Sequence, residues 1–203
     1  MKSIWIAAAA TGMMLAQAAP AQLPPGVFAG EKSYAAATAG TYDLDAGHTA
    51  VIAKVSHIGY SLSVFRFDKV SGTLTWDPAR PEASALSVEV ATASISTPVP
   101  GFAAELGGKG FLNTQAYPTA TFVSTAFHKI DATHGKVDGQ FTLMGKTRPL
   151  TFNVELMGAG KGFMGKPRLG IAAAADINPA DFGLPAMFAA PIALVIDAEF
   201  AHQ

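Results

Sequence analysis

The sequence has no cysteine, few charged residues and no long apolar run beyond its N-terminus. Without cysteine the chain forms no disulfide and offers neither a thiol nucleophile nor a thiolate metal site. Only 14% of its 203 residues are charged and the formal net charge is −1, so no basic surface for nucleic acid is indicated. Because no later segment is apolar for long enough to span a bilayer, stable membrane insertion is not expected.

Motifs of common enzyme classes are also missing. The chain has no G-x-S-x-G, H-E-x-x-H, P-loop or S-x-x-K pattern, and its acids form no convincing catalytic pair. His48 and His57 are nine residues apart, so on one unbroken strand they point to opposite faces, and only a bulge would bring them together. We therefore expect no catalytic residue, no metal and no cofactor.

The N-terminus has the pattern of a secretory signal peptide. Residues 1–21 begin with Lys2, continue with an apolar run too short to span a membrane comfortably, and end in small residues that suit cleavage near Ala18 or Ala21. The pattern predicts a periplasmic or secreted protein, and an N-terminal membrane anchor is the alternative. Residues 22–40 are rich in Ala, Pro and Gly and are predicted to be a disordered leader.

The rest of the chain is rich in short strand patterns. The clearest is Gly135–Met157, where two runs alternate apolar and polar residues with a period of two. The connector Met144–Pro149 contains Gly and Pro and predicts an antiparallel hairpin. A short helix is expected within Pro100–Asn113. Strands are also expected at Thr41–Leu44, His48–His57, Leu62–Asp68, Ser71–Trp76, Ala85–Ala93, Ala120–Ile130, Leu169–Ile177 and Ile192–Ala201.

This pattern predicts one all-β domain over residues 41–203, either a sandwich or a barrel. Eight or more antiparallel strands with one apolar face can close into a barrel, which removes every sheet edge and can hold one small ligand. Gly139 and the alanine-rich strand Ile171–Ala175 supply little side-chain volume, so they would leave an apolar interior cavity. Ordinary packing of bulky phenylalanines against these small residues is the alternative.

Strand parity predicts which residues face that interior. The expected ligand-binding residues are Val55, Phe67, Phe122, Phe141, Phe152, Val154 and Phe182, with His57 as the contact to a polar head group. Phe182 lies in the compact loop Asn178–Leu184, which suits either a barrel-closing turn or one rim of a cavity mouth.

Several motifs resemble the YceI-like polyisoprenoid-binding family. The resemblance covers about residues 41–200 and implies an eight-stranded antiparallel, lipocalin-like β-barrel with a short helix and an apolar interior cavity. It also implies that the partner is an isoprenoid lipid or isoprenoid quinone, bound in the periplasm, and it brings no catalytic residue. The motifs are Tyr42–Asp45, Ser56–Gly59, Val70–Thr73, Phe111–Asn113, Tyr117–Phe122, Leu143–Leu150 and Ile177–Leu184.

One segment departs from the family, and other functions stay open. Where the family has a charged Arg-Asp-x-His-Leu segment, this chain has Gly101–Leu106, in which only Leu106 fits. A lipid-acting isomerase or hydrolase would need His57 and an acid to converge inside the barrel. A barrel with a filled core would serve a structural or partner-binding role, and the sequence leaves a homodimer open.

Overall fold

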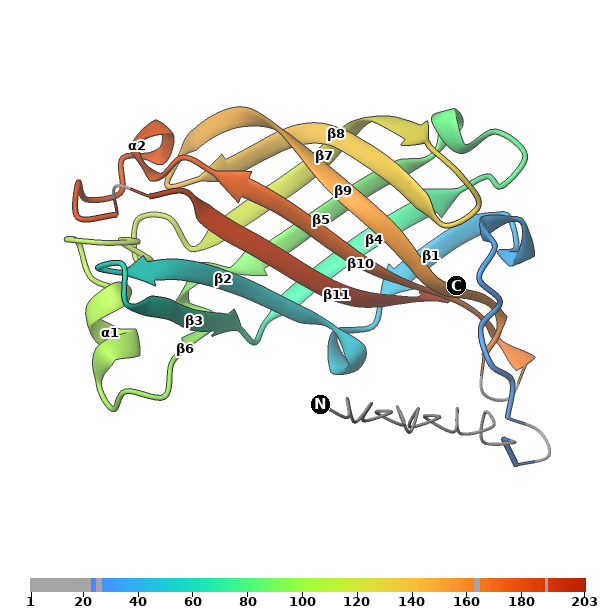
Figure 1. The fold of residues 1–203 in the computed structure, drawn as a ribbon, viewed down its shortest axis with the longest axis horizontal. Coiled ribbons are helices and arrows are strands. Elements are labelled where there is room, and N and C mark those ends of the chain that lie inside the picture. Colours follow the sequence, from blue (N-terminus) through green and yellow to red (C-terminus); the bar gives the residue numbers. More distant parts are fainter. Residues whose placement is uncertain (1–22, 25–26, 163–164, 189) are drawn as a thin grey trace, which may run out of the picture.

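The computed structural model describes residues 23–24, 27–162, 165–188 and 190–203, and the predicted signal peptide lies outside them. The described chain is almost entirely antiparallel sheet (Figure 1). The strands are β1 (Gly40–Leu44), β2 (Ala50–His57), β3 (Ser61–Phe67), β4 (Val70–Trp76), β5 (Ala85–Ala91), β6 (Ile95–Ser96), β7 (Thr119–Lys129), β8 (His134–Leu143), β9 (Lys146–Lys161), β10 (Pro167–Ile177) and β11 (Ile192–His202). The short helices are η1 (Tyr34–Ala36), η2 (Ala46–His48), η3 (Pro81–Ala83), η4 (Thr92–Ser94), α1 (Phe102–Leu106) and α2 (Pro179–Phe182).

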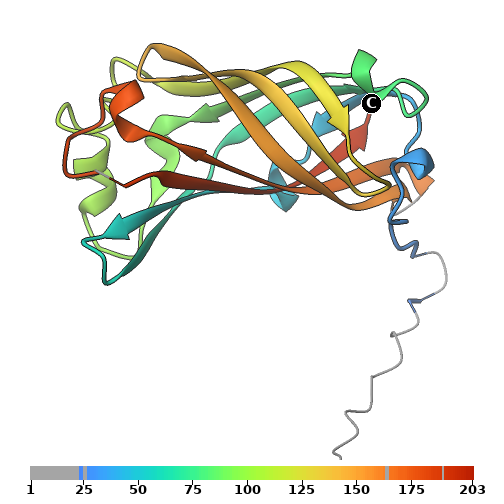
Figure 2. The same ribbon diagram turned by 45° about the horizontal axis from the view of Figure 1, so that its top comes forward.

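Eight strands close into a barrel, which confirms the number and the closure that the family resemblance implied. β1 pairs with β4 on one side and with β11 on the other, so the order β1-β4-β5-β7-β8-β9-β10-β11 returns to its start. Strands β2, β3 and β6 continue the sheet from β11. As a result the β2–β3 hairpin projects from one end of the barrel, the end that also carries α1 and α2 (Figures 1 and 2).

The β8–β9 hairpin confirms the predicted parity but not the predicted connector. Val137, Gly139 and Leu143 are buried, whereas Gln140 between them is exposed. The connector was expected over Met144–Pro149, yet its last four residues already belong to β9. The turn is only Met144–Gly145, with φ of 51° and 71°, which is the type I′ geometry that matches the twist of paired strands.

Two clusters of buried side chains pack the two ends of the barrel. The cluster near α1 and α2 includes Phe65, Leu106 and Phe182. The cluster at the other end includes Tyr42 and Phe200. Each such side chain stabilises the fold by about 1.5–3 kcal/mol on burial, so a chain without disulfides derives its stability from these clusters.

Part of the segment predicted to be a disordered leader packs against the barrel, which corrects that prediction for residues 31–37. Glu31 pairs with Ala159 of β9, and the Tyr34 backbone N–H donates to the Ala132 carbonyl at 3.3 Å. The Tyr34 ring lies edge-on to Trp76, with 6.4 Å between the ring centroids. Composition alone predicted disorder because these long-range aromatic and backbone contacts leave no local signature.

Gly139 is required by the packing of β7 on β8, and Gly139→Ala should destabilise the fold. A Cβ at this position would lie 2.5 Å from the Val123 backbone oxygen and closer still to the Phe122 ring. Overpacking of this kind costs about 1–3 kcal/mol, which should lower Tm by roughly 2–12 °C in a thermal unfolding experiment. Gly170→Ala is the matched control, because its Cβ would meet no atom closer than 3.8 Å. Equal Tm values for the two variants would contradict this interpretation.

Candidate ligand cavity

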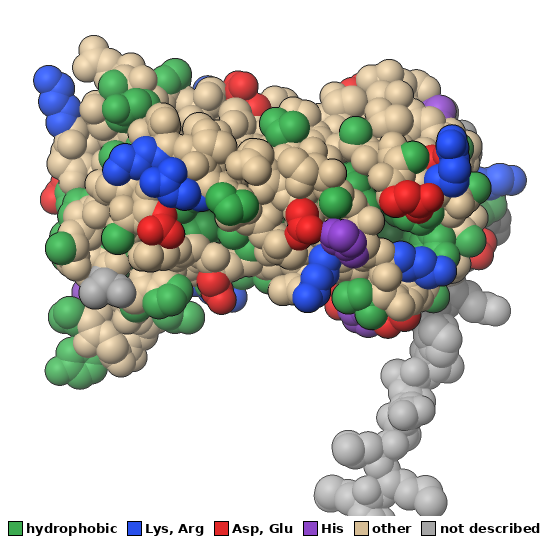
Figure 3. All heavy atoms as spheres, turned by 90° about the horizontal axis from the view of Figure 1, so that it is seen from above, with side chains coloured by type: hydrophobic (Ala, Val, Ile, Leu, Met, Phe, Trp, Pro, Cys, Tyr) green, Lys and Arg blue, Asp and Glu red, His purple; other side chains and the backbone are tan. Residues whose placement is uncertain are grey.

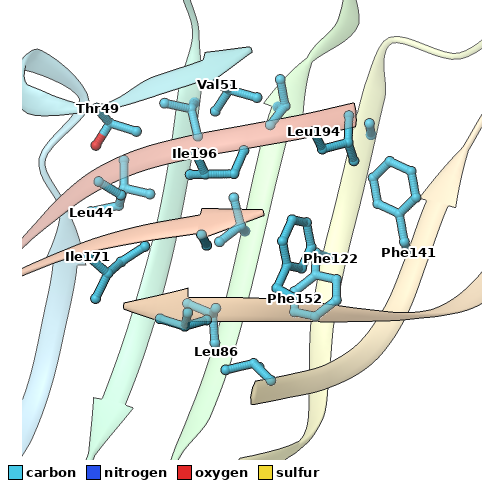
Figure 4. Close-up of a pocket in the computed structure, with 18 of the residues that line it drawn as sticks. Leu44, Thr49, Val51, Leu86, Phe122, Phe141, Phe152, Ile171, Leu194 and Ile196 are labelled. Atoms are coloured by element: carbon cyan, nitrogen blue, oxygen red, sulfur yellow. The ribbon is translucent and has the colours of Figure 1, made fainter. Parts of the chain in front are cut away.

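The barrel encloses a cavity of about 310 Å³ with an almost wholly apolar lining (Figure 4). Phe122 and Phe152 lie together in its wall, 5.1 Å apart and edge to face, and Ile196 of β11 also points into it. One water-sized group needs roughly 10–15 Å³ of such space. The cavity therefore accommodates at most about 20–30 such groups, or about four to six five-carbon isoprene units.

The strand period explains why the cavity is apolar and why it remains open. Along β10, Leu169, Ile171, Ala173 and Ile177 line the cavity, whereas the alternate side chains point outward. Ala173 pairs with residues of both neighbouring strands, β9 and β11, and itself extends only a methyl group into the interior. The predicted shortage of side-chain volume on this strand therefore coincides with open space.

Six of the eight residues predicted from the sequence line this cavity. They are Val55, Phe67, Phe122, Phe141, Phe152 and Val154. They come from five strands, so closure of the barrel brings together residues that are distant in sequence. Their contact with a ligand stays a prediction.

The other two predicted residues lie elsewhere. Phe182 is buried but outside the lining, where its ring supports Phe141 edge-on at a centroid distance of 5.3 Å. His57 is exposed and outside the lining. It has the same parity as inward-facing Val55, but the β2–β3 hairpin has left the barrel wall at that point, so no cavity surrounds it.

The sequence reasoning missed the polar end of the cavity. All charged and histidine residues of the lining lie within residues 128–136, at the β7–β8 turn: His128, Lys129, Asp131, His134 and Lys136. Two lysines and two histidines directly after an apolar strand are a local signal, and all four side chains are exposed to solvent. The position of this turn over the cavity end depends on closure of the barrel.

The β7–β8 turn is fixed by hydrogen bonds to Asp131. The backbone N–H groups of Thr133 and His134 donate to its carboxylate, at 2.8 and 2.7 Å, and they lower the pKa of Asp131 to about 2. Lys129 lies over the Tyr34 ring, with Nζ 4.6 Å from the ring centroid. The polar end of the cavity is therefore a defined structure with fixed charges.

Thr133, His134 and Asp131 come together but do not form a catalytic triad. Both the Thr133 hydroxyl and the Asp131 carboxylate contact the same ring nitrogen, His134 Nδ1, at 3.1 and 3.0 Å. A triad needs the nucleophile and the acid on different nitrogens of the histidine. This arrangement therefore gives no support to the hydrolase alternative.

A second polar cluster lies on the outside of the barrel. Asp45, His48 and Glu199 hold ligand atoms within 4.8 Å of one another, a spacing that a metal ion could use. However, Arg168 Nη1 already bridges both acids, 2.8 Å from Asp45 Oδ2 and 2.6 Å from Glu199 Oε2. Hydrogen bonds from His48 and then from Arg168 hold the pKa of Asp45 below its ordinary value. The cluster thus joins β10 and β11 to η2 as an ion-pair network.

Within the described ranges, no helix combines the length and hydropathy needed to cross a membrane.

In a comparison with known proteins, residues 42–200 match the YceI-like domain family. A UPF0312 protein of Pseudomonas putida strain W619 is 36% identical over 168 residues, which cover 76% of this chain and 88% of that relative. The YCEI protein of Campylobacter jejuni superposes with a TM-score of 0.66 at 27% identity, covering 74% of this chain and 91% of that one. A polyisoprenoid binding domain from Saccharophagus degradans superposes with a TM-score of 0.59 at 16% identity, covering 80% and 98%.

Proposed function

The chain belongs to the YceI-like family, and on this premise we propose that it is a periplasmic or secreted carrier that holds an isoprenoid chain inside its barrel. The family is one of binding-protein barrels and not a known enzyme family. The observation that carries the proposal is the apolar cavity of about 310 Å³ inside the closed barrel. The polyisoprenoid binding domain among the structural neighbours supports this class of ligand, and the pattern of residues 1–21 supports export.

The size of the cavity sets the energy scale. Burial of each CH₂ group contributes about 0.8 kcal/mol, so a chain of about 20–30 carbons would gain on the order of 16–24 kcal/mol before losses. Ordering a flexible chain offsets much of that gain, which keeps the affinity below the practical ceiling of about 20 kcal/mol. Chain length and shape would then decide specificity.

The charge distribution orients the proposed ligand. The hydrocarbon chain would lie along the apolar interior, and its polar head group would lie at the β7–β8 turn. Lys129 can donate a hydrogen bond there to a phosphate or to a quinone carbonyl, whereas Lys136 pairs with Asn153 on the outer face of the barrel. A phosphate would gain more from this cation, because charged partners form the stronger hydrogen bonds.

The alternatives receive less support from the geometry. An enzyme that relies on His57 is disfavoured because His57 lies outside the cavity. A barrel with a filled core is disfavoured because the interior has room for several isoprene units. No observation on the described residues favours either of these functions over binding.

Organic extraction of the purified full-length protein, followed by mass spectrometry, tests the proposal. We expect an isoprenoid in the extract, absent from a protein-free sample processed in parallel. Protein stripped of lipid should also bind an added polyprenyl phosphate or isoprenoid quinone. Failure to recover any isoprenoid, together with failure to bind both added lipids, would overturn the proposed function.

A further inference from the structure

The turn between β2 and β3 carries a residue that its geometry disfavours. Ile58 and Gly59 have φ of 45° and 80°, so both central positions of the turn are left-handed, as type I′ requires. Glycine adopts this conformation freely, and asparagine adopts it with little strain. A β-branched isoleucine does not, because its side chain collides with the backbone.

The turn between β8 and β9 shows what can offset such strain. Met144 has a φ of 51°, and its side chain is half-buried against the core cluster near α1 and α2. The Ile58 side chain is 80% exposed, and the neighbouring Tyr60 is 87% exposed. Packing within the described chain therefore does not compensate for the strained conformation of Ile58. A contact between the Ile58 side chain and another molecule would explain why isoleucine occupies this position.

Apolar side chains continue from this turn along the outer face of β3. Leu62 and Val64 are 59% and 48% exposed there, while the inner face of the same hairpin lines the cavity with Val55 and Phe65. In Figure 3 the projection at the lower left, which corresponds to the projecting hairpin of Figure 2, has hydrophobic side chains at its tip. One hairpin thus presents apolar groups both to the cavity and to the outside.

The charges and the area of this tip favour a lipid surface over a protein partner. Residues 50–67 contain Lys54, His57 and Arg66 but no Asp or Glu, which suits anionic head groups. Arg66 is paired with Asp68 at 3.1 Å, so Lys54 is the cation nearest the tip. The four exposed apolar side chains present less than the roughly 800 Å² that each partner contributes to a stable protein interface.

We propose that the β2–β3 tip docks on a lipid bilayer that contains anionic lipids. Ile58 and Tyr60 enter the interface between head groups and acyl chains, where aliphatic and aromatic side chains are both stable, and Lys54 remains at the level of the head groups. The purpose of docking rests on the proposed function. A chain bound with its head group at the β7–β8 turn would have its hydrocarbon end toward the docked end of the barrel, next to the bilayer.

The substitution Ile58→Asn distinguishes a role of Ile58 in membrane docking from a role in stabilising the fold, because the two roles predict different outcomes. Asparagine relieves the left-handed strain, so Tm should rise by roughly 2–4 °C. Binding of the full-length protein to vesicles of phosphatidylethanolamine and phosphatidylglycerol, measured by co-sedimentation, should fall by about tenfold because the apolar contact is lost. Ile130→Asn is the matched control: Ile130 is 61% exposed next to the β7–β8 turn, and its replacement should leave vesicle binding unchanged.

Three results would overturn the docking proposal. They are failure of the unaltered protein to sediment with these vesicles, equal sedimentation of Ile58→Asn and the unaltered protein, and a dimer in analytical ultracentrifugation that Ile58→Asn dissociates. The vesicles contain no isoprenoid, so a separate equilibrium measurement with farnesol, a three-unit isoprenoid, tests the cavity. Farnesol binding without vesicle binding would overturn only the docking, and vesicle binding without uptake of any isoprenoid would overturn only the carrier function.

Discussion

Phe152→Asp should reduce isoprenoid loading at least 100-fold at pH 8. The Phe152 side chain points into the apolar part of the cavity, against Phe122 (Figure 4). A carboxylate there has no cation within the apolar lining, and leaving a buried charge unpaired costs several kcal/mol, which corresponds to more than two orders of magnitude in affinity. The aspartate can instead protonate, so loading should recover in part as the pH falls. Quantitative lipid extraction across pH 5–8 measures both effects.

Asn153→Asp is the control for this substitution. Asn153 is the next residue of β9, exposed on the outer face of the barrel, so the variant adds the same charge without changing the cavity. Both variants should keep the far-ultraviolet circular dichroism of a β-barrel. If Phe152→Asp folds and loads as well as Asn153→Asp does, Phe152 does not contact the ligand.

The parity of the strands could be predicted because it is a local property. Along β8 and β9, alternation between apolar and polar residues identified the inward face before any pairing was known, and Phe141 and Phe152 both line the cavity. A register error of one residue would place these rings in solvent, so the pattern itself constrains the register. Family resemblance then added the number of strands, which local patterns do not determine.

Features that depend on where the barrel ends could not be predicted in this way. His57 has inward parity, yet β2 leaves the barrel wall before it, so parity and burial disagree. Lys129 and Tyr34 are far apart in sequence and meet only because the segment around η1 packs against the β7–β8 turn. Ile58 appeared as part of a family motif, and only its φ and its exposure show that the chain retains a strained apolar turn.

Ala173→Phe should shorten the longest isoprenoid that the protein retains. Ala173 faces the cavity from β10, and a phenyl ring there adds six carbons to the interior. At roughly 10–15 Å³ for each water-sized group, the ring occupies about 60–90 Å³, close to a quarter of the cavity. The bound chain should therefore lose about one isoprene unit, which a mixture of polyprenols of different lengths, separated by mass spectrometry after extraction, would reveal as a shift in the retained lengths.

The matched variant for this change is Ala174→Phe. Ala174 is the next residue of β10 and is exposed on the outer face, so its replacement adds the same ring outside the barrel and should leave the retained lengths unchanged. An equal profile for both variants would show that chain length is not limited by the volume beside Ala173. If Ala173→Phe instead reduces the binding of polyprenols of every length equally, with Tm unchanged, Ala173 lies on the path by which ligands enter the cavity. If the volume of the cavity limits the length of the bound chain, the retained chains should become shorter, because each five-carbon unit occupies space that a larger side chain would fill.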